Sequence, residues 1–112
     1  MPDCVFCKVA RGEIPAAVVK RNDRLIAFRD INPQAPTHLL VIPVEHIASL
    51  DEARDAALLG EMLRFAAELA RESAIAGPGY RVVVNTNANG GQTVPHLHLH
   101  VLGGRAMTWP PG

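Results

Sequence analysis

Residues 94–104 read VPHLHLHVLGG, a run of three histidines in which one leucine separates each histidine from the next. Successive side chains of a β-strand point to opposite faces of its sheet. A strand over residues 95–102 therefore places the three histidines on one face, spaced by about 7 Å. Leu97, Leu99 and Val101 then share the other face and bury it. The stretch predicts a sheet with a hydrophobic core on one face and a polar strip on the other.

The histidines His96, His98 and His100 leave several interpretations open. Imidazole is the commonest metal ligand, but one strand spaces three rings too widely for a single ion. Imidazole also titrates near neutral pH and attacks phosphorus, which favours acid–base or nucleophilic catalysis. The remaining readings are an incidental solvated strip and an expression tag, and the alternation with leucine argues against a tag.

The loop before this strand favours catalysis on a phosphate. Residues 87–93 read NANGGQT and end shortly before the histidine run. Glycines allow positive φ and let backbone N–H groups approach an anion closely. Gln92 and Thr93 add hydrogen-bonding side chains, so a phosphate held by this loop would lie beside the histidine face.

The rest of the chain predicts an α+β fold, a mostly antiparallel sheet of about five strands with one long helix packed on one face. A short N-terminal helix is expected within residues 3–15, with Asp3 as its cap, and the long helix over residues 49–74. The other strands are expected at residues 17–20, 25–29, 37–43 and 80–85, the third of them buried on both faces. The long helix is expected to bury the apolar stripe Ala56, Leu59, Leu63, Ala66 and Ala70.

The amino-acid composition limits the kinds of partner that the protein is expected to bind. The chain has 112 residues, the size of a single domain (1–112), with 11 basic and 11 acidic residues. This balance predicts binding to neither nucleic acid nor a membrane surface. A cytoplasmic protein is expected, in which Cys4 and Cys7 do not form a structural disulfide. Their C-x-x-C spacing leaves three readings: a redox pair, half of a zinc site, or two small core residues.

The chain resembles the histidine-triad (HIT) superfamily, and within it the Hint branch. HLHLHVL (residues 96–102) fits the pattern of three histidines alternating with apolar residues. EIPA, DRLIAFRDINPQAPTHLLVIPVEHI, YRVVVN and the C-terminal GGQTVPHLHLHVLGGRAMTWPPG are also similar to Hint. The resemblance implies the HIT-like fold, a homodimer that joins two sheets, and C-terminal residues, Trp109 among them, near the partner's site.

The resemblance also implies roles for individual residues. His98 is the implied nucleophile on the α-phosphorus, and Asp30 the carboxylate that holds the ribose hydroxyls. His38 matches a fourth active-site histidine, and His96 completes the catalytic set. The implied phosphate contacts are His100, Asn85, Gly91 and Thr93. The implied lining of the base pocket is Phe6, Val9, Ile14, Phe28, Ile31 and Leu40.

Two further expectations follow from the resemblance. Some bacterial-type HIT proteins bind structural zinc, which here implies the ligands Cys4, Cys7, His46 and His96.

The implied activity is that of a purine nucleoside phosphoramidase. It would act on adenosine 5′-phosphoramidates through a nucleotidyl-histidine, with purine nucleotides as substrates and no organic cofactor. The alternatives are hydrolysis of dinucleoside polyphosphates, nucleotidyl transfer, or a nucleotide-binding regulatory module.

Overall fold

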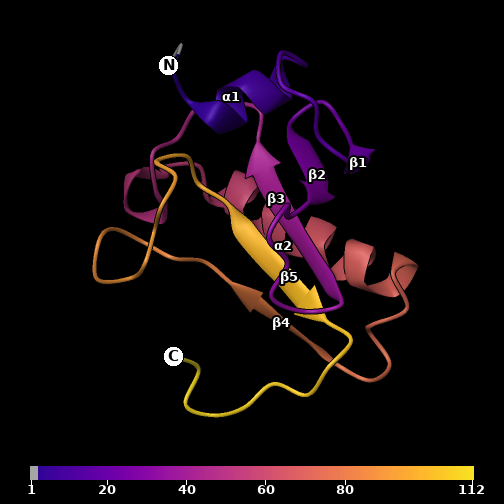
Figure 1. Cartoon of the computed structure of the whole chain (residues 1–112). Coiled ribbons are helices and arrows are strands. Elements are labelled where there is room, and N and C mark those ends of the chain that lie inside the picture. Colours follow the sequence, from indigo (N-terminus) through magenta and orange to yellow (C-terminus); the bar gives the residue numbers. More distant parts are fainter. Residues whose placement is uncertain (1–2) are drawn as a thin grey trace.

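Five antiparallel strands form one sheet in the order β1-β2-β3-β5-β4, and two α-helices pack against it (Figure 1). The computed structural model describes residues 3–112. The elements are α1 (Val5–Ala10), β1 (Val18–Arg21), β2 (Leu25–Arg29), β3 (Thr37–Pro43), the 3₁₀ turn η1 (Leu50–Glu52), α2 (Ala56–Glu72), β4 (Tyr80–Val83) and β5 (Leu99–Gly103). Within residues 3–112 no helix is both long and apolar enough to cross a membrane.

The α+β architecture predicted from the sequence is confirmed, and so is the central position of β3. The bounds of β2 and β3 agree with those expected. Strand β3 lies between β2 and β5, and both of its faces are buried because one packs in the cluster under α2 and the other in the cluster under α1. The short N-terminal helix is present, but Cys4 caps it instead of Asp3, since the Cys4 sulfur accepts the backbone N–H of Cys7.

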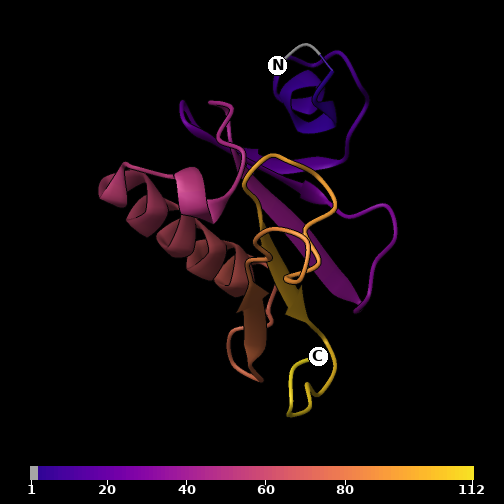
Figure 2. The ribbon, with the colours of Figure 1, turned by 90° about the vertical axis from the view of Figure 1, so that its left-hand side faces the viewer.

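The two faces of the sheet carry separate apolar clusters. Helix α2 lies along one face (Figure 2) and packs on alternate residues of the central strands, such as Leu39, Val41 and Val101. On the opposite face, α1 packs on the residues between them, such as Phe28 and Leu40. The alternation inferred for the histidine run therefore holds, because Leu97, Leu99 and Val101 all belong to the cluster under α2.

The long helix begins later than predicted and buries a different stripe. Helix α2 begins at Ala56 because the Asp55 side chain caps it by accepting the N–H of Leu58. Its buried residues are Leu58, Met62, Phe65, Ala66, Leu69 and Ala70. The expected stripe was therefore wrong at Ala56 and Leu63, which are exposed, and only partly correct at Leu59. Apolar residues flank the true face on both sides, so their spacing alone did not fix the rotation of the helix.

The last two strands are also shorter than predicted. Strand β4 ends at Val83, and β5 begins at Leu99, so His96 and His98 lie in the extended segment before it. This segment lies beside the loop that comes after β3. The N–H of Leu97 donates a hydrogen bond of 2.7 Å to the carbonyl oxygen of Ile47 in that loop. His98 and His100 are also closer than expected, with ring centroids 5.0 Å apart.

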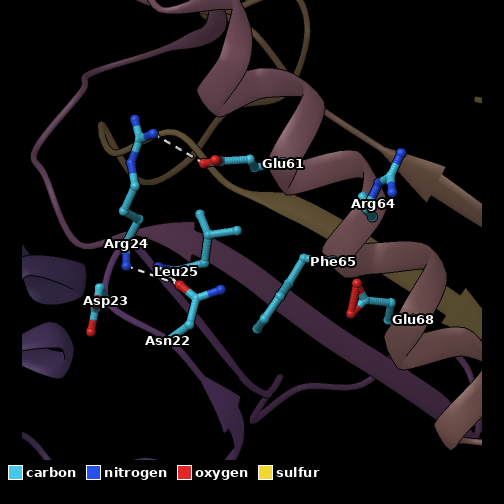
Figure 3. A pocket seen from close by; sticks show the side chains of 8 residues that line it. All are labelled: Asn22, Asp23, Arg24, Leu25, Glu61, Arg64, Phe65 and Glu68. Atoms are coloured by element: carbon cyan, nitrogen blue, oxygen red, sulfur yellow. Dashed lines mark hydrogen bonds and ion pairs between the residues drawn. The ribbon is translucent and has the colours of Figure 1, made fainter.

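Ion pairs attach the β1–β2 hairpin to α2 (Figure 3). The Arg24 guanidinium lies 3.1 Å from Glu61 of α2, the pair drawn in Figure 3. It also lies 2.7 Å from Asp55, the N-cap residue of α2. The Asn22 side chain shapes the turn by accepting the N–H groups of Arg24 and Leu25. The Arg24 ion pairs therefore fix the position of the hairpin relative to the start of α2.

Two substitutions test the rotation of α2. Met62 is 1% exposed and Leu63 is 56% exposed. Met62→Ala should lower the free energy of unfolding by about 2–5 kcal/mol, because it leaves a cavity in the core. Leu63→Ala should cost well under half as much. Urea denaturation of both variants checks this, and equal losses would contradict the observed face.

Candidate active site and metal centre

A cavity of about 350 Å³ opens on the sheet face opposite α2. It lies between α1, the loop after α1, the end of β2 and the start of β5. Its lining residues are Val5, Phe6, Val9, Ile14, Pro15, Ala16, Phe28, Arg29, Asp30, Ile31, Leu40, Thr93, Val94, His98 and His100. The lining from α1 and β3 is apolar, while Asp30, Thr93, His98 and His100 supply a carboxylate, a hydroxyl and two imidazoles, so the cavity suits a ligand with a flat apolar ring and an anionic group.

Most of the residues predicted for a nucleotide site meet in this cavity. All six predicted base-pocket residues line it, together with Asp30, Thr93, His98 and His100. The sequence reasoning did not identify Val5, Pro15, Ala16, Arg29 and Val94. Pro15 and Ala16 directly follow Ile14, so their proximity to a predicted lining residue was the available signal.

The glycine-rich loop, residues 87–93, contributes less to the lining of the cavity than expected. Asn85, Gly91 and Gln92 are not among the lining residues of the cavity. The Gln92 amide instead shapes the loop, accepting the N–H of Asn87 and donating to the carbonyls of Ala48 and Val94. Gly91 has φ +83°, a conformation that favours glycine.

The hydrogen bond of His98 fixes the state of its neutral ring. His98 Nδ1 lies 2.7 Å from the carbonyl oxygen of His96. A carbonyl can only accept, so Nδ1 carries the proton and Nε2 keeps its lone pair. The ring also packs edge-on against Phe6, with centroids 5.1 Å apart. His98 therefore offers an oriented nucleophilic nitrogen to the cavity.

His38 and His100 form a hydrogen-bonded chain that places the proton of His100 on Nε2, the nitrogen that is unprotonated in neutral His98. The backbone N–H of Gln34 donates to His38 Nδ1 over 3.0 Å, so the proton of neutral His38 is on Nε2. That nitrogen lies 2.8 Å from His100 Nδ1 and donates to it. The proton of neutral His100 is consequently on Nε2, which makes His100 a hydrogen-bond donor beside a neighbour, His98, that presents a lone pair.

Burial keeps these two rings neutral. Desolvation lowers the pKa of His38, and the nearby Asp30 carboxylate, 3.4 Å away, opposes this effect. Desolvation lowers the pKa of His100 to about 4, reinforced by the neighbouring His98 and His38. His100 thus remains a neutral donor across the physiological pH range.

His96 faces a different set of residues from the other two triad histidines. Its side chain is fully buried and does not line the cavity. Nε2 lies 2.8 Å from the carbonyl oxygen of Pro43, so it carries the proton and donates a hydrogen bond to that oxygen. The Nδ1 lone pair therefore points at the cysteines, 3.3 Å from Cys4 Sγ and 3.6 Å from Cys7 Sγ.

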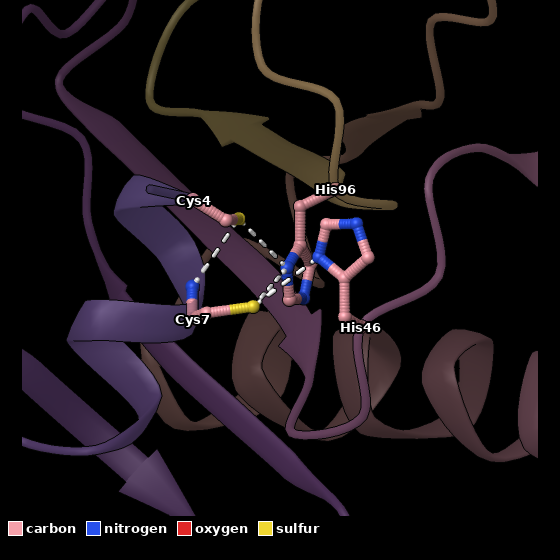
Figure 4. A group of neighbouring side chains, drawn as sticks. All are labelled: Cys4, Cys7, His46 and His96. Carbon is pink, nitrogen blue, oxygen red and sulfur yellow. Dashed lines mark hydrogen bonds between the residues drawn. The ribbon is translucent and has the colours of Figure 1, made fainter. Parts of the chain in front are cut away.

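Cys4, Cys7, His46 and His96 converge from three segments of the chain (Figure 4). Their ligand atoms all lie within 4.8 Å of one another, and Cys7 Sγ lies 3.2 Å from His46 Nδ1. Tetrahedral Zn²⁺ with typical Zn–S and Zn–N bonds separates neighbouring ligands by about 3.3–3.8 Å. The four side chains fit a closed S₂N₂ zinc site, and the Pro43 carbonyl holds His96 in the tautomer that a metal requires.

A second group of possible metal ligands, one carboxylate and two imidazoles, lies beside the cavity. Asp30, His38 and His100 also bring ligand atoms within 4.8 Å of one another. The facing nitrogens of His38 and His100 are already joined by a hydrogen bond, however. This group is therefore better described as the hydrogen-bonded chain than as a metal site.

Comparison with known proteins identifies the family. Residues 11–107 match the HIT domain family, and the chain belongs to that family. The fold agrees with that of a HIT family hydrolase from Legionella pneumophila, at a TM-score of 0.96 and 54% identity over 98% of this chain and 100% of that one.

Two relatives are similar over nearly their whole length. An uncharacterized HIT-like protein of Synechocystis is 51% identical over 98% of this chain and 97% of its own. The purine nucleoside phosphoramidase of Escherichia coli K12 is 46% identical over 94% of this chain and 90% of its own.

The His100 environment makes a prediction for its titration. His100 should stay neutral as the pH falls from 8 to 5, because its pKa is lowered to about 4. The unfolded chain takes up a proton near pH 6.5, so the folded state is disfavoured as the pH falls from 6.5 towards 4. NMR titration of the ring checks this, with His100→Gln to assign the signal. A midpoint near 6.5 would contradict the desolvated environment.

The metal cluster makes a second prediction. Purified protein should carry about one zinc per chain, and Cys4→Ser should lose it and lower thermal stability, since metal binding contributes to folding. Zinc should also leave as the pH drops, because the ligands bind deprotonated. Elemental analysis measures the content, and Asp3→Ser, an exposed neighbour, is the control that should keep zinc. Metal-free wild-type protein of undiminished stability would contradict the zinc site.

Proposed function

We propose that the protein is a HIT-family nucleotide hydrolase that cleaves the P–N bond of purine nucleoside 5′-phosphoramidates, typically of adenosine. One observation carries the proposal: a free imidazole lone pair on His98 and an imidazole N–H on His100 face one cavity with an apolar lining from α1 and β3. The similarity to a purine nucleoside phosphoramidase over most of both chains supports it.

The cavity suggests how a nucleotide is oriented. The purine lies between Phe6, Val9 and Phe28, where aromatic and aliphatic walls bury a flat ring. Asp30 accepts hydrogen bonds from the ribose hydroxyls. Its Oδ1 already accepts the N–H of Asn32 over 2.8 Å, which holds the carboxylate in place. The phosphate then lies beside His98, His100 and Thr93.

Bond cleavage begins at His98. Its Nε2 attacks the α-phosphorus and forms an N–P bond, while the P–N bond to the amine breaks. The amine leaves with the electron pair of that bond and takes up a proton from solvent water. The His98 ring becomes cationic, and its Nδ1–H still donates to the His96 carbonyl, which stabilises the positive charge.

Hydrolysis completes the cycle, and His100 assists both steps. Water attacks the phosphorus and loses a proton to solvent, the bond to Nε2 breaks, and His98 regains its lone pair. The N–H of His100 donates to a phosphoryl oxygen as negative charge develops there. Neutral His38 carries one ring proton, and it already donates this proton in its hydrogen bond to His100. The hydrogen bonds from Gln34 through His38 therefore orient the His100 ring and do not deliver protons to it.

We also propose that the protein acts in the cytoplasm as a homodimer. Strand β4 is at the edge of the sheet, where unpaired backbone groups can pair with a second copy. Trp109 lies in the C-terminal tail and is 82% exposed, as expected of a residue that contacts a partner chain.

Substrate comparison and one substitution test the function. The wild-type protein should release the amine from an adenosine 5′-phosphoramidate much faster than it cleaves a diadenosine polyphosphate. His98→Ala should abolish amine release, a loss of at least about 10³-fold, and still bind AMP, because the ribose and base contacts come from other residues.

Each contrary result has its own meaning. Faster cleavage of the diadenosine polyphosphate would assign the protein to that activity. Near wild-type turnover by His98→Ala would remove His98 from the role of nucleophile. AMP binding without turnover of either substrate would favour a regulatory nucleotide-binding module.

A further inference from the structure

Helix α1 cannot be stable on its own local structure. It has six residues, Val5–Ala10, whereas isolated helices shorter than about 12–15 residues are marginal in water. Its position must therefore come from side-chain contacts with the sheet. Phe6, Cys7 and Val9 supply these contacts, because they are the buried residues of the helix.

The contacts of α1 divide into two sets that serve different sites. Cys7 and its N-cap residue Cys4, three positions apart, face His46 and His96 (Figure 4). Phe6 and Val9, also three positions apart, line the nucleotide cavity. One short helix thus connects the metal cluster to the wall of the cavity.

A second connection runs through His96. Its ring belongs to the metal cluster, and its carbonyl oxygen holds His98 in the nucleophilic tautomer. Phe6 packs edge-on against both rings, at centroid distances of 5.9 Å to His96 and 5.1 Å to His98. Movement of either the cysteines or His96 would therefore disturb the cavity directly.

We infer that metal binding by Cys4, Cys7, His46 and His96 is energetically coupled to nucleotide binding. The cysteines act as positioning residues: with metal bound, they hold α1 so that Phe6 and Val9 form the wall of the base pocket. Without metal, apolar contacts and weak thiol–imidazole hydrogen bonds hold α1 in place of metal–ligand bonds, and the wall loosens. The inference rests on the proposed function, because it assigns the cavity to a nucleotide.

Such coupling is reciprocal. If metal strengthens nucleotide binding by some factor, the nucleotide strengthens metal binding by the same factor. Coupling between sites is typically about 5–150-fold. Since α1 supplies part of one wall and leaves Phe28, Leu40 and Asp30 in place, we expect a value near the lower end, about tenfold.

AMP and zinc are the probes for the test. Isothermal titration should give a Kd for AMP about tenfold higher in metal-stripped protein and in Cys7→Ser than in zinc-loaded wild type. Amide hydrogen exchange should show faster exchange in α1 of the stripped protein, with α2 unchanged. A chelator should remove zinc more slowly from wild-type protein saturated with AMP than from protein in equal inorganic phosphate.

Two control variants separate coupling from general destabilisation. Phe6→Leu should weaken AMP binding and retain zinc, because it alters the wall and leaves the ligands intact. Ile75→Val removes one methyl group from the core on the other face of the sheet. It should lower thermal stability without changing the affinity for either AMP or zinc.

The zinc-release measurement needs only folded, loaded protein, so it decides the matter even if the stripped protein unfolds. Equal release with AMP and with phosphate, in protein that binds AMP, would overturn the coupling and leave the proposed function standing. Zinc-loaded protein that does not bind AMP would overturn both. If Ile75→Val lost as much affinity for AMP as Cys7→Ser, that result would also overturn the coupling.

Discussion

The antiparallel pairing of β3 with β5 is the constraint on which both the core and the candidate site depend. It aligns Leu40 with His100 and His38 with Leu102, so His38 and His100 become diagonal neighbours on one face. Val101 and Leu39 are paired on the other face and join the core under α2. A shift of one residue would turn the histidines into that core and the aliphatic residues into the cavity. Core packing therefore holds the imidazoles in register.

Backbone groups then give chemically identical rings opposite roles. The His96 carbonyl leaves the lone pair of neutral His98 on Nε2, while the N–H of Gln34, acting through His38, places the proton of His100 on Nε2. In each ring the position of the proton follows from a backbone group, directly for His98 and through His38 for His100. The His96 ring is fixed in the same way by the Pro43 carbonyl and faces the cysteines. Three histidines of one repeat thus present three different groups: a lone pair to the cavity from His98, an N–H from His100, and a lone pair to the cysteines from His96.

The sequence predicted the parts of this arrangement that depend on alternation. Alternation predicted the faces of Leu97, Leu99 and Val101, and the sequence pattern predicted the limits of β2 and β3. The apolar lining of the cavity was expected only from the resemblance to the HIT superfamily. The sequence did not predict the rotation of α2, because Leu59 and Leu63 are as apolar as Leu58 and Met62, and only packing on the sheet distinguishes them. The loop role of Gln92 and the buried position of the His96 ring depend on partners distant in sequence, Ala48 and Pro43, which no local pattern reveals.

The central claim is that His98 and His100 present opposite nitrogens to the cavity: a lone pair on His98 Nε2 and a proton on His100 Nε2. Long-range ¹H–¹⁵N correlation NMR of ¹⁵N-histidine-labelled protein near pH 7 reads these tautomers directly, with His98→Ala and His100→Gln to assign the rings. The account predicts the Nδ1–H form for His98 and the Nε2–H form for His100. The same tautomer in both rings, or a proton on His98 Nε2, would contradict it.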